Sequence, residues 1–483
     1  MRASRSWLTL AVMSAGLFLA VLSTTVVSVA LPTMGRDLQA SPADLEWIVD
    51  AYVIVYASLL VAGGAAGDRY GRKGLFLVGT AIFGLGSLAA GLAPAVGVLL
   101  AARVLQGIGP ALLVPGSLTI LRATFTDQRQ RAVAIGVWST ASGLALALGP
   151  PIGGLLVDGL GWRWVFLINV PLAGLLVLTA ARFVPRLPRG AGVTGFDWPG
   201  AALVTFALAA LAFGTIEGQA RGWGAPVVAA AFAAGAAGLS GFVAAERRQA
   251  GRRAGPLIDL GLFRRPAFTA AGIAAAGVFF AFVGLIVYLS AYFQQVQGHS
   301  AVRAGLDVTT VGVSYALAAT WSGRLTGRIG ERWPLIAGLV IAGAATLGLL
   351  RLAPGTPLSA IWWNFALLGG GIGLCGTPIS AIAMSAVDVP RAGMASAVVN
   401  SLRQVGQVFG VAVLGALVYA RLPGGAGGAR PGPAQALAFT AGLHVALWVC
   451  GLVLLAVAAL VAGLVAVPAR RRSRPGEVSA QAR

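Results

Sequence analysis

A short charged run, Gly67 to Lys73 (GDRYGRK), joins two long apolar stretches and restricts the folds open to this chain more than any other feature. Charged residues make up only 10% of the sequence. A basic turn this short between two apolar stretches is therefore unusual. Two apolar helices joined in this way are typical of a transmembrane hairpin whose turn lies on the cytoplasmic side.

The composition also indicates a membrane protein. Hydrophobic residues make up 58% of the 483 residues, whereas soluble domains have about 45–50%. The net charge of +20 comes from basic residues spread among short loops, which argues against a nucleic-acid-binding face. Both cysteines lie in apolar spans and both histidines are isolated, so we expect neither a disulfide framework nor a metal site.

Stretches of about 20 apolar residues, the length needed to cross a bilayer, predict fourteen transmembrane helices. They lie near 8–32, 47–66, 74–94, 97–120, 132–157, 162–184, 198–217, 225–245, 266–290, 302–321, 334–352, 358–384, 393–420 and 437–467. The first is longer than the core of a signal peptide and is interpreted as an uncleaved span. With both termini in the cytoplasm, 26 of the 35 Lys and Arg residues fall in cytoplasmic segments and seven in outer loops. This asymmetry favours that orientation.

The predicted helices divide as six, two and six. We expect an N-terminal six-helix bundle, two extra transmembrane helices, a basic cytoplasmic loop, a C-terminal six-helix bundle and a basic cytoplasmic tail, over 1–190, 191–245, 246–265, 266–467 and 468–483.

An internal repeat supports two related bundles. The pattern of Gly64, Arg69, Gly71 and Lys73 recurs 259 residues later, as Gly323, Arg328, Gly330 and Arg332. The second copy lacks the acid, because Gly327 stands where Asp68 does. Duplicated units around a central pathway are common among secondary transporters.

Several stretches together resemble the fourteen-helix drug:proton antiporters of the major facilitator superfamily, over nearly the whole chain. They are the loop run ending at Lys73, RVLQG from 103, GLALALGPPIGG from 143, WRWVFLINVP from 162, PLIDLGLFRRPAF from 256, and the 396–415 run with Asn400, Arg403 and Gln404. The resemblance implies an all-α membrane protein of the major facilitator fold. It also implies an actinobacterial-type exporter of hydrophobic drug- or antibiotic-like molecules that works by alternating access while protons move inward.

The loop motif comprises Gly67, Asp68, Arg69, Gly71 and Arg72. Asp68 lies at a predicted helix end, where its carboxylate can accept the free N–H groups of a neighbouring helix. Arg69 and Arg72 can pair with this carboxylate or with lipid phosphates. The resemblance implies a latch that holds the cytoplasmic side closed in one state, and the alternative is a topology anchor without a switching role.

The fifth predicted helix carries an unusual concentration of glycine and proline. The residues concerned are Gly143, Gly149, Pro150, Gly153 and Gly154. Glycine permits close helix contact in lipid, and proline bends a helix. We interpret this stretch as a seam between the two bundles, which the resemblance associates with exporters, and the alternative is ordinary tight packing.

Ionisable groups inside spans are costly and are therefore candidates for proton coupling. Asp50 and Arg103 lie at depths that agree within about 3 Å, so they can form a pair whose separation would load or release a proton. The alternative places Asp50 and Glu46 in an outer polar rim.

The family usually has an acid in its first helix where Ser23 stands here. Asp50, Glu217 or Asp307 would then take the coupling role, or coupling is weakened or absent.

Midplane aromatic and polar residues are predicted to line an apolar substrate cavity. They are Thr24, Thr25, Trp138, Phe280, Tyr288, Trp363, Asn364 and Gln404. The alternative is packing against lipid or against neighbouring helices. Because buried acids are scarce, a neutral or singly charged hydrophobic compound fits better than a dication.

The sequence has no phosphate-binding loop of the form G-x-x-x-x-G-K followed by Ser or Thr, and no soluble domain large enough to hydrolyse ATP. We therefore expect no enzyme activity, no cofactor, and no nucleotide or nucleic-acid partner. The expected partners are substrate, protons and the bilayer of the bacterial inner membrane, with the chain as a monomer. Two rival functions remain open: an importer or facilitator of a small metabolite, and a non-transporting sensor or scaffold.

Overall fold

The computed structural model describes residues 2–187, 197–249, 260–387, 392–420 and 432–465. Within these ranges, some side chains inside helices, including those of Asp68 and Arg69, lie outside the described residues. The secondary structure of the described ranges is helical throughout. This is expected in a bilayer, where each backbone polar group must find its partner within the segment itself.

The first half of the chain forms seven helical segments. They are α1 (Arg2–Asp37), α2 (Pro42–Tyr70), α3 (Arg72–Gly91), α4 (Val96–Thr124), α5 (Gln128–Leu160), α6 (Trp164–Leu167) and α7 (Asn169–Phe183). The predicted span 162–184 is interrupted, because α6 ends at Leu167 and α7 begins at Asn169. The start of α2 is fixed by a capping box, in which Ser41 and Asp44 exchange side-chain-to-backbone hydrogen bonds.

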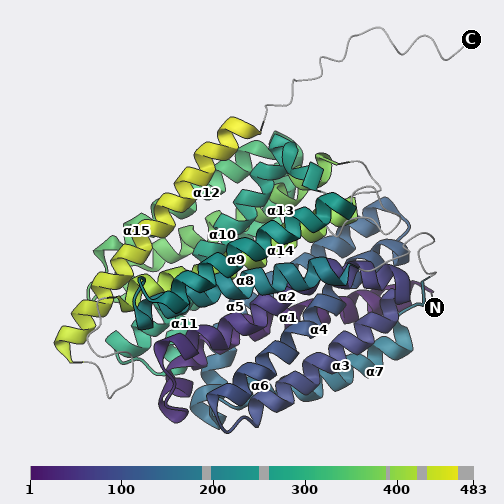
Figure 1. Ribbon diagram of the computed structural model, residues 1–483. Coiled ribbons are helices and arrows are strands. Elements are labelled where there is room, and N and C mark those ends of the chain that lie inside the picture. The colour runs from purple at the N-terminus through teal and green to yellow at the C-terminus, as the bar shows by residue number, and fades with distance from the viewer. Residues whose placement is uncertain (1, 188–196, 250–259, 388–391, 421–431, 466–483) are drawn as a thin grey trace, which may run out of the picture.

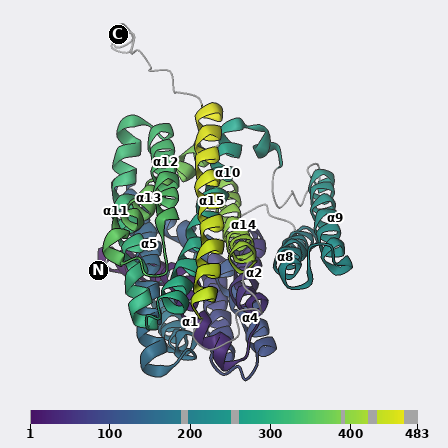
Figure 2. The same cartoon turned by 90° about the vertical axis from the view of Figure 1, so that its left-hand side faces the viewer.

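Two helices lie outside the main body. α8 (Trp198–Arg221) and α9 (Pro226–Gln249) pack against each other, and α8 also contacts α2 and α14. Figure 2 shows this helix pair standing to one side of the other helices. A short 3-10 helix, η1 (Leu260–Arg264), precedes the second half.

The second half repeats the pattern of long helices. Its elements are α10 (Pro266–Ala291), η2 (Tyr292–Val296), α11 (Ala301–Ile329), α12 (Arg332–Gly348), η3 (Leu349–Arg351), η4 (Leu358–Ala360), α13 (Trp362–Ser385), α14 (Ala392–Tyr419) and α15 (Pro433–Leu464). The described chain thus contains fourteen helices of 15 residues or more, each on one of the predicted spans. Eleven helices of the described residues are long and apolar enough to cross a membrane, and α2, α8 and α11 fall outside that group.

The two halves meet along a small set of helices. α5 contacts α11, α2 contacts α14, and α1 contacts α10. We call the end of the molecule that holds the start of α1 and the end of α15 the inner end, and the opposite end the outer end, following the orientation expected from the sequence. Figure 1 shows the two halves converging at the outer end, in the lower left of the view.

The closest contacts between the halves lie toward the outer end. A Cβ atom on Gly154 of α5 would lie 2.5 Å from the Cα of Val302 on α11, and one on Gly305 of α11 would overlap the Pro150 carbonyl oxygen. Beside them, the Val302 amide donates to Asp158 Oδ2 over 3.0 Å. At the inner end of α11, by contrast, Gly323 and Gly327 have open space around them. We call the contact of α5 with α11 and of α2 with α14 at this end the outer seam.

The internal repeat has the same local structure in both halves. Gly71 and Gly330 each end a helix with a positive φ, 103° and 83°, which favours glycine. The cation two residues later binds the end of the last helix of its own half. Lys73 Nζ donates to the carbonyls of Ala181 and Val184, both over 2.8 Å. Arg332 Nη2 donates to the carbonyl of Ala462 over 2.6 Å.

We expect Gly71→Ala to lower the free energy of unfolding by about 1–3 kcal/mol, because alanine would be strained at this φ. Gly74→Ala is the matched control, since both positions have open space but Gly74 has no positive φ. Alanine at position 74 should raise stability by about 0.5–1 kcal/mol. Thermal unfolding of the purified protein in detergent measures both changes, and equal effects would exclude the conformational explanation.

Candidate functional site

A buried polar network surrounds Arg103 in α4. Its Nε donates to the Ile48 carbonyl over 2.8 Å, and its Nη1 contacts Gln106 Oε1 at 2.6 Å and Ser23 Oγ at 3.3 Å. The guanidinium also lies over the Tyr52 ring, 4.4 Å from its centroid. Arg103 is completely buried, and these contacts join α1, α2 and α4 around it.

Asp50 lies in α2 but does not join this network. The side chain is completely buried, and neither carboxylate oxygen has a hydrogen-bond partner. The pair with Arg103 expected from the sequence is therefore not formed in this structure. Arg103 is held by neutral acceptors instead, and Ser23 occupies the place where the family pattern would supply an acid.

The other two candidate coupling acids have local partners. Glu217 Oε2 pairs with Arg221 Nε over 2.6 Å, one turn later on α8. Asp307 in α11 is buried, and its Oδ2 lies 2.6 Å from His299 Nδ1. The His299 ring stacks on Phe293 with a centroid distance of 5.7 Å. This pair could not be predicted from the sequence, because His299 lies eight positions before Asp307, precedes α11 and is placed by the turn at its start.

The loop motif forms the tight connection between α2 and α3. The Gly71 amide donates to the Gly67 carbonyl over 3.1 Å, which closes the last turn of α2. Arg72 begins α3 and is partly exposed. Because the side chains of Asp68 and Arg69 lie outside the described residues, the latch role of the motif stays a prediction.

The glycines of α5 serve two different contacts. Gly154 closely approaches Val302 of α11. Gly143 is also next to α11, but at an ordinary van der Waals distance. Gly149 and Gly153 instead approach Thr25 and Val26 of α1, within the same half of the chain. The motif therefore combines a contact between the halves with packing inside one half.

The predicted substrate residues make a series of separate local contacts. Thr24 and Thr25 bond to helix carbonyls, Trp138 donates to Ser117 Oγ over 3.1 Å, and Phe280 is partly buried. Asn364 is buried and accepts from Arg351 Nη2 over 2.8 Å. The Arg351 guanidinium covers the ring of Trp363, 4.6 Å from its centroid. Gln404 in α14 leaves its Oε1 without a partner.

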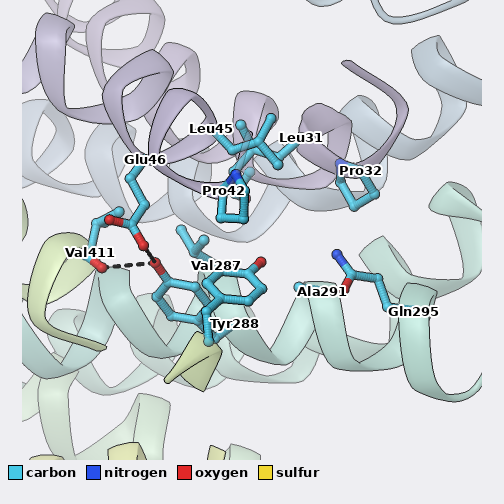
Figure 3. A pocket seen from close by; sticks show the side chains of 12 residues that line it. Leu31, Pro32, Pro42, Leu45, Glu46, Val287, Tyr288, Ala291, Gln295 and Val411 are labelled. Carbon is cyan, nitrogen blue, oxygen red and sulfur yellow. Dashed lines mark hydrogen bonds between the residues drawn. The ribbon is translucent and has the colours of Figure 1, made fainter. Parts of the chain in front are cut away.

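Only Tyr288 of this set lines the pocket shown in Figure 3. The pocket lies between α1, α2, α10, η2 and α14 and has an empty volume of about 350 Å³, including space open to solvent. Its polar lining includes Ser28, Glu46 and Gln295. Glu46, one turn before Asp50, lies in an outer polar rim in the alternative interpretation of the sequence, but it is only 6% exposed.

Among the residues that the structure describes, no group of three or more His, Cys, Asp and Glu side chains is placed to hold a metal ion. Cys375 and Cys450 are both free and buried.

Two related helical halves that contact each other most closely toward the outer end, with ionisable side chains buried between and within them, are typical of a membrane transporter. The sequence profile of the Major Facilitator Superfamily matches residues 13–411. The chain belongs to this superfamily. It is therefore a multi-pass membrane transporter for small molecules and not an enzyme.

Curated relatives and solved structures agree with this assignment. The chain is 35% identical over 417 residues to the multidrug resistance protein Stp of Mycobacterium tuberculosis, covering 86% of this chain and 76% of that one. It is 38% identical over 430 residues to a probable actinorhodin transporter of Streptomyces coelicolor, covering 87% and 73%. An inward-facing, occupied bacterial homologue of the human lysosomal transporter Spinster has the same fold, with a TM-score of 0.65, 18% identity and coverage of 94% and 96%.

The position of Ser23 beside Arg103 allows a test of the missing acid. We expect Ser23→Asp to be at least about 1 kcal/mol more favourable with Arg103 present than in the Arg103→Gln background, because the carboxylate would compensate a buried cation. Thermal unfolding of the four proteins measures this coupling. Ser23→Asn in both backgrounds is the control, and equal effects of Ser23→Asp in the two backgrounds would contradict the explanation.

Proposed function

We propose that this chain is a proton-coupled exporter of hydrophobic, antibiotic-like small molecules. It would act as a monomer in the bacterial cytoplasmic membrane, with both termini in the cytoplasm and the proton gradient as its energy source. Support for the substrate class comes from the relatives, which include the tetracenomycin C resistance and export protein and the puromycin resistance protein pur8 of two Streptomyces species.

The observation that most supports proton coupling is the state of Asp50. An ionised carboxylate that is buried without a partner costs several kcal/mol, and both Asp50 oxygens are in that position. Asp50 can therefore ionise only when the groups around its carboxylate also change. A rearrangement that brings its carboxylate to water or to Arg103 would favour loss of the proton, and a return to the present surroundings would favour its uptake.

Arg103 offers the corresponding counter-charge. Its Nη2 is buried without a hydrogen-bond partner, whereas its Nε and Nη1 are bound to neutral groups. The two N–H groups of Nη2 are therefore left for a carboxylate that approaches in another state of the cycle. Coupling would then not need the first-helix acid that is usual in the family, because Asp50 would approach Arg103 from α2 in that other state.

Substrate recognition is best supported along α14. Gln404 Oε1 and Gln407 Nε2 are buried without partners, so they can accept and donate hydrogen bonds to a bound molecule. The neighbouring helices α10 and α11 contribute the apolar pair Phe282 and Tyr315, whose rings stack with a centroid distance of 5.3 Å. A hydrophobic molecule with a few polar groups suits such a lining.

Asp50→Asn should abolish efflux driven by a pH gradient but leave equilibrium exchange of substrate largely unchanged, because only the proton-carrying group is removed. Proteoliposomes with an imposed gradient and puromycin as the test compound measure both activities, and the direction of driven movement separates an exporter from an importer. Asp44→Asn on the same helix is the control, since Asp44 is not buried and the asparagine Oδ1 can still accept from the Ser41 amide in the capping box. Unchanged driven efflux would remove Asp50 from the mechanism.

Asp68→Ala should slow the transport cycle several-fold without changing the amount of protein inserted in the membrane, if the loop motif acts as a latch. Asp68→Asn is the matched control for Asp68→Ala. It retains a hydrogen-bond acceptor for helix N–H groups, so it should slow the cycle less. Turnover in proteoliposomes and immunodetection in membranes measure the two quantities. Normal turnover of Asp68→Ala would leave the motif as a topology anchor.

A further inference from the structure

Glu46 is a buried acid that the coupling scheme above does not use. It lies in the second turn of α2, but its side chain reaches the other half of the molecule. Figure 3 shows Glu46 directed toward Tyr288 of α10 and the Val411 carbonyl of α14. The three groups meet at the outer seam, beside the pocket described above.

The helix opposite is shaped to receive this acid. A Cβ atom at Gly415 of α14 would overlap both Glu46 Oε1 and the Tyr288 hydroxyl. The absence of a side chain at position 415 therefore makes room for two polar groups in an apolar seam. The space at Gly415 holds Glu46 only while α2 and α14 are in contact.

The contacts of the Tyr288 hydroxyl indicate that Glu46 is protonated. The Tyr288 hydroxyl oxygen lies 2.8 Å from the Val411 carbonyl oxygen and 3.3 Å from Glu46 Oε1. A carbonyl and an ionised carboxylate can only accept, while a tyrosine hydroxyl has one proton to donate. Each contact is a full two-centre hydrogen bond only if Glu46 carries a proton and donates to Tyr288, while Tyr288 in turn donates to Val411; with an ionised Glu46, the one Tyr288 proton would have to be shared between two acceptors.

The charged surroundings lead to the same conclusion. The titratable groups that face Glu46 are Asp50 on its own helix, Tyr288 on α10 and Tyr419 on α14. From α1 and η2 the pocket receives the neutral side chains of Ser28 and Gln295. None of the ion pairs formed by the described residues includes Glu46. A negative charge at Glu46 would thus be buried beside a second acid without a cation.

We propose that Glu46 and Tyr288 form a second proton-binding site, which holds a proton whenever the outer seam is closed. The site deepens the proposed proton-coupled function and rests on it for its role in the cycle. The pocket lies beside this site, and Leu31, Pro32 and Pro42 line it where α1 turns into α2.

The chemistry of the step is a reversible protonation. When the halves separate at the outer end, the Glu46 carboxylate meets outer water and an O–H bond forms at Oε1 with a proton taken from a hydronium ion, which becomes water. Closure of the seam then buries the neutral acid against Tyr288. Opening reverses both steps and returns the proton to the same side, so this site controls closure whereas Asp50 would carry the transported proton.

The test measures the distance across the outer end as a function of pH in the full-length protein. Spin labels at Gly159→Cys and Ser359→Cys, both exposed positions in different halves, are placed after Cys375 and Cys450 are replaced by alanine. Electron–electron double resonance in detergent, without substrate or gradient, then reports the closed and open populations between pH 5 and 9. We expect the closed population to fall as the pH rises.

Glu46→Gln should abolish this pH response and keep the seam closed, because the amide stays neutral and still donates to Tyr288. Tyr288→Phe should retain the response but shift its midpoint to lower pH by about one unit, equivalent to a tenfold change in the proton affinity. Glu217→Gln is the control and should leave the response unchanged, since Glu217 pairs with Arg221 at the outer end of α8.

Two results would overturn the proposal: an unchanged distance across this pH range in the otherwise native labelled protein, or the same response in Glu46→Gln. Either is independent of the transport assay on Asp50→Asn. A lost pH response in Glu46→Gln together with unaffected driven efflux in Asp50→Asn would support this site while removing the proposed coupling at Asp50. The reverse combination would keep the coupling and remove this site.

Discussion

The close approach of α5 and α11 at the outer end is the contact on which the other features of the structure depend. Gly154 and Gly305 allow the two backbones to come within van der Waals distance, and small residues provide such contacts in lipid, where no hydrophobic driving force acts between helices. With the halves joined there, α2 reaches α14 and Glu46 becomes buried against Tyr288. One backbone contact thus decides whether an acid on a different helix faces water.

The buried charges of the first half are held by neutral groups rather than by opposite charges. Arg103 binds a carbonyl, an amide and a hydroxyl, while Asp50 binds nothing in this state. Such an arrangement is poorly suited to a purely structural role, because a buried ion pair or an apolar pair would cost less. It suits a transporter, in which the same groups must be stable in two sets of surroundings.

Much of the fold could be predicted from the sequence, because the length of apolar runs and the distribution of arginine are dictated by the bilayer. The fourteen helices and the repeated turns at Gly71 and Gly330 follow from these signals. The break at Ile168 and the partners of Asp50, Arg103 and Asp307 could not be predicted, since they depend on rotation of helices about their axes. Glu46 was visible as an acid near Asp50, but no pattern along α2 shows that Gly415 lies opposite it.

Lys73 and Arg332 have a mechanical consequence for the transport cycle. Each ties the start of one helix to the carbonyl end of the last helix of the same half, α3 to α7 and α12 to α15. Such a tie opposes sliding between the two helices that it joins. In the proposed cycle, these helix pairs would then keep their register while the two halves change their contact at the outer end.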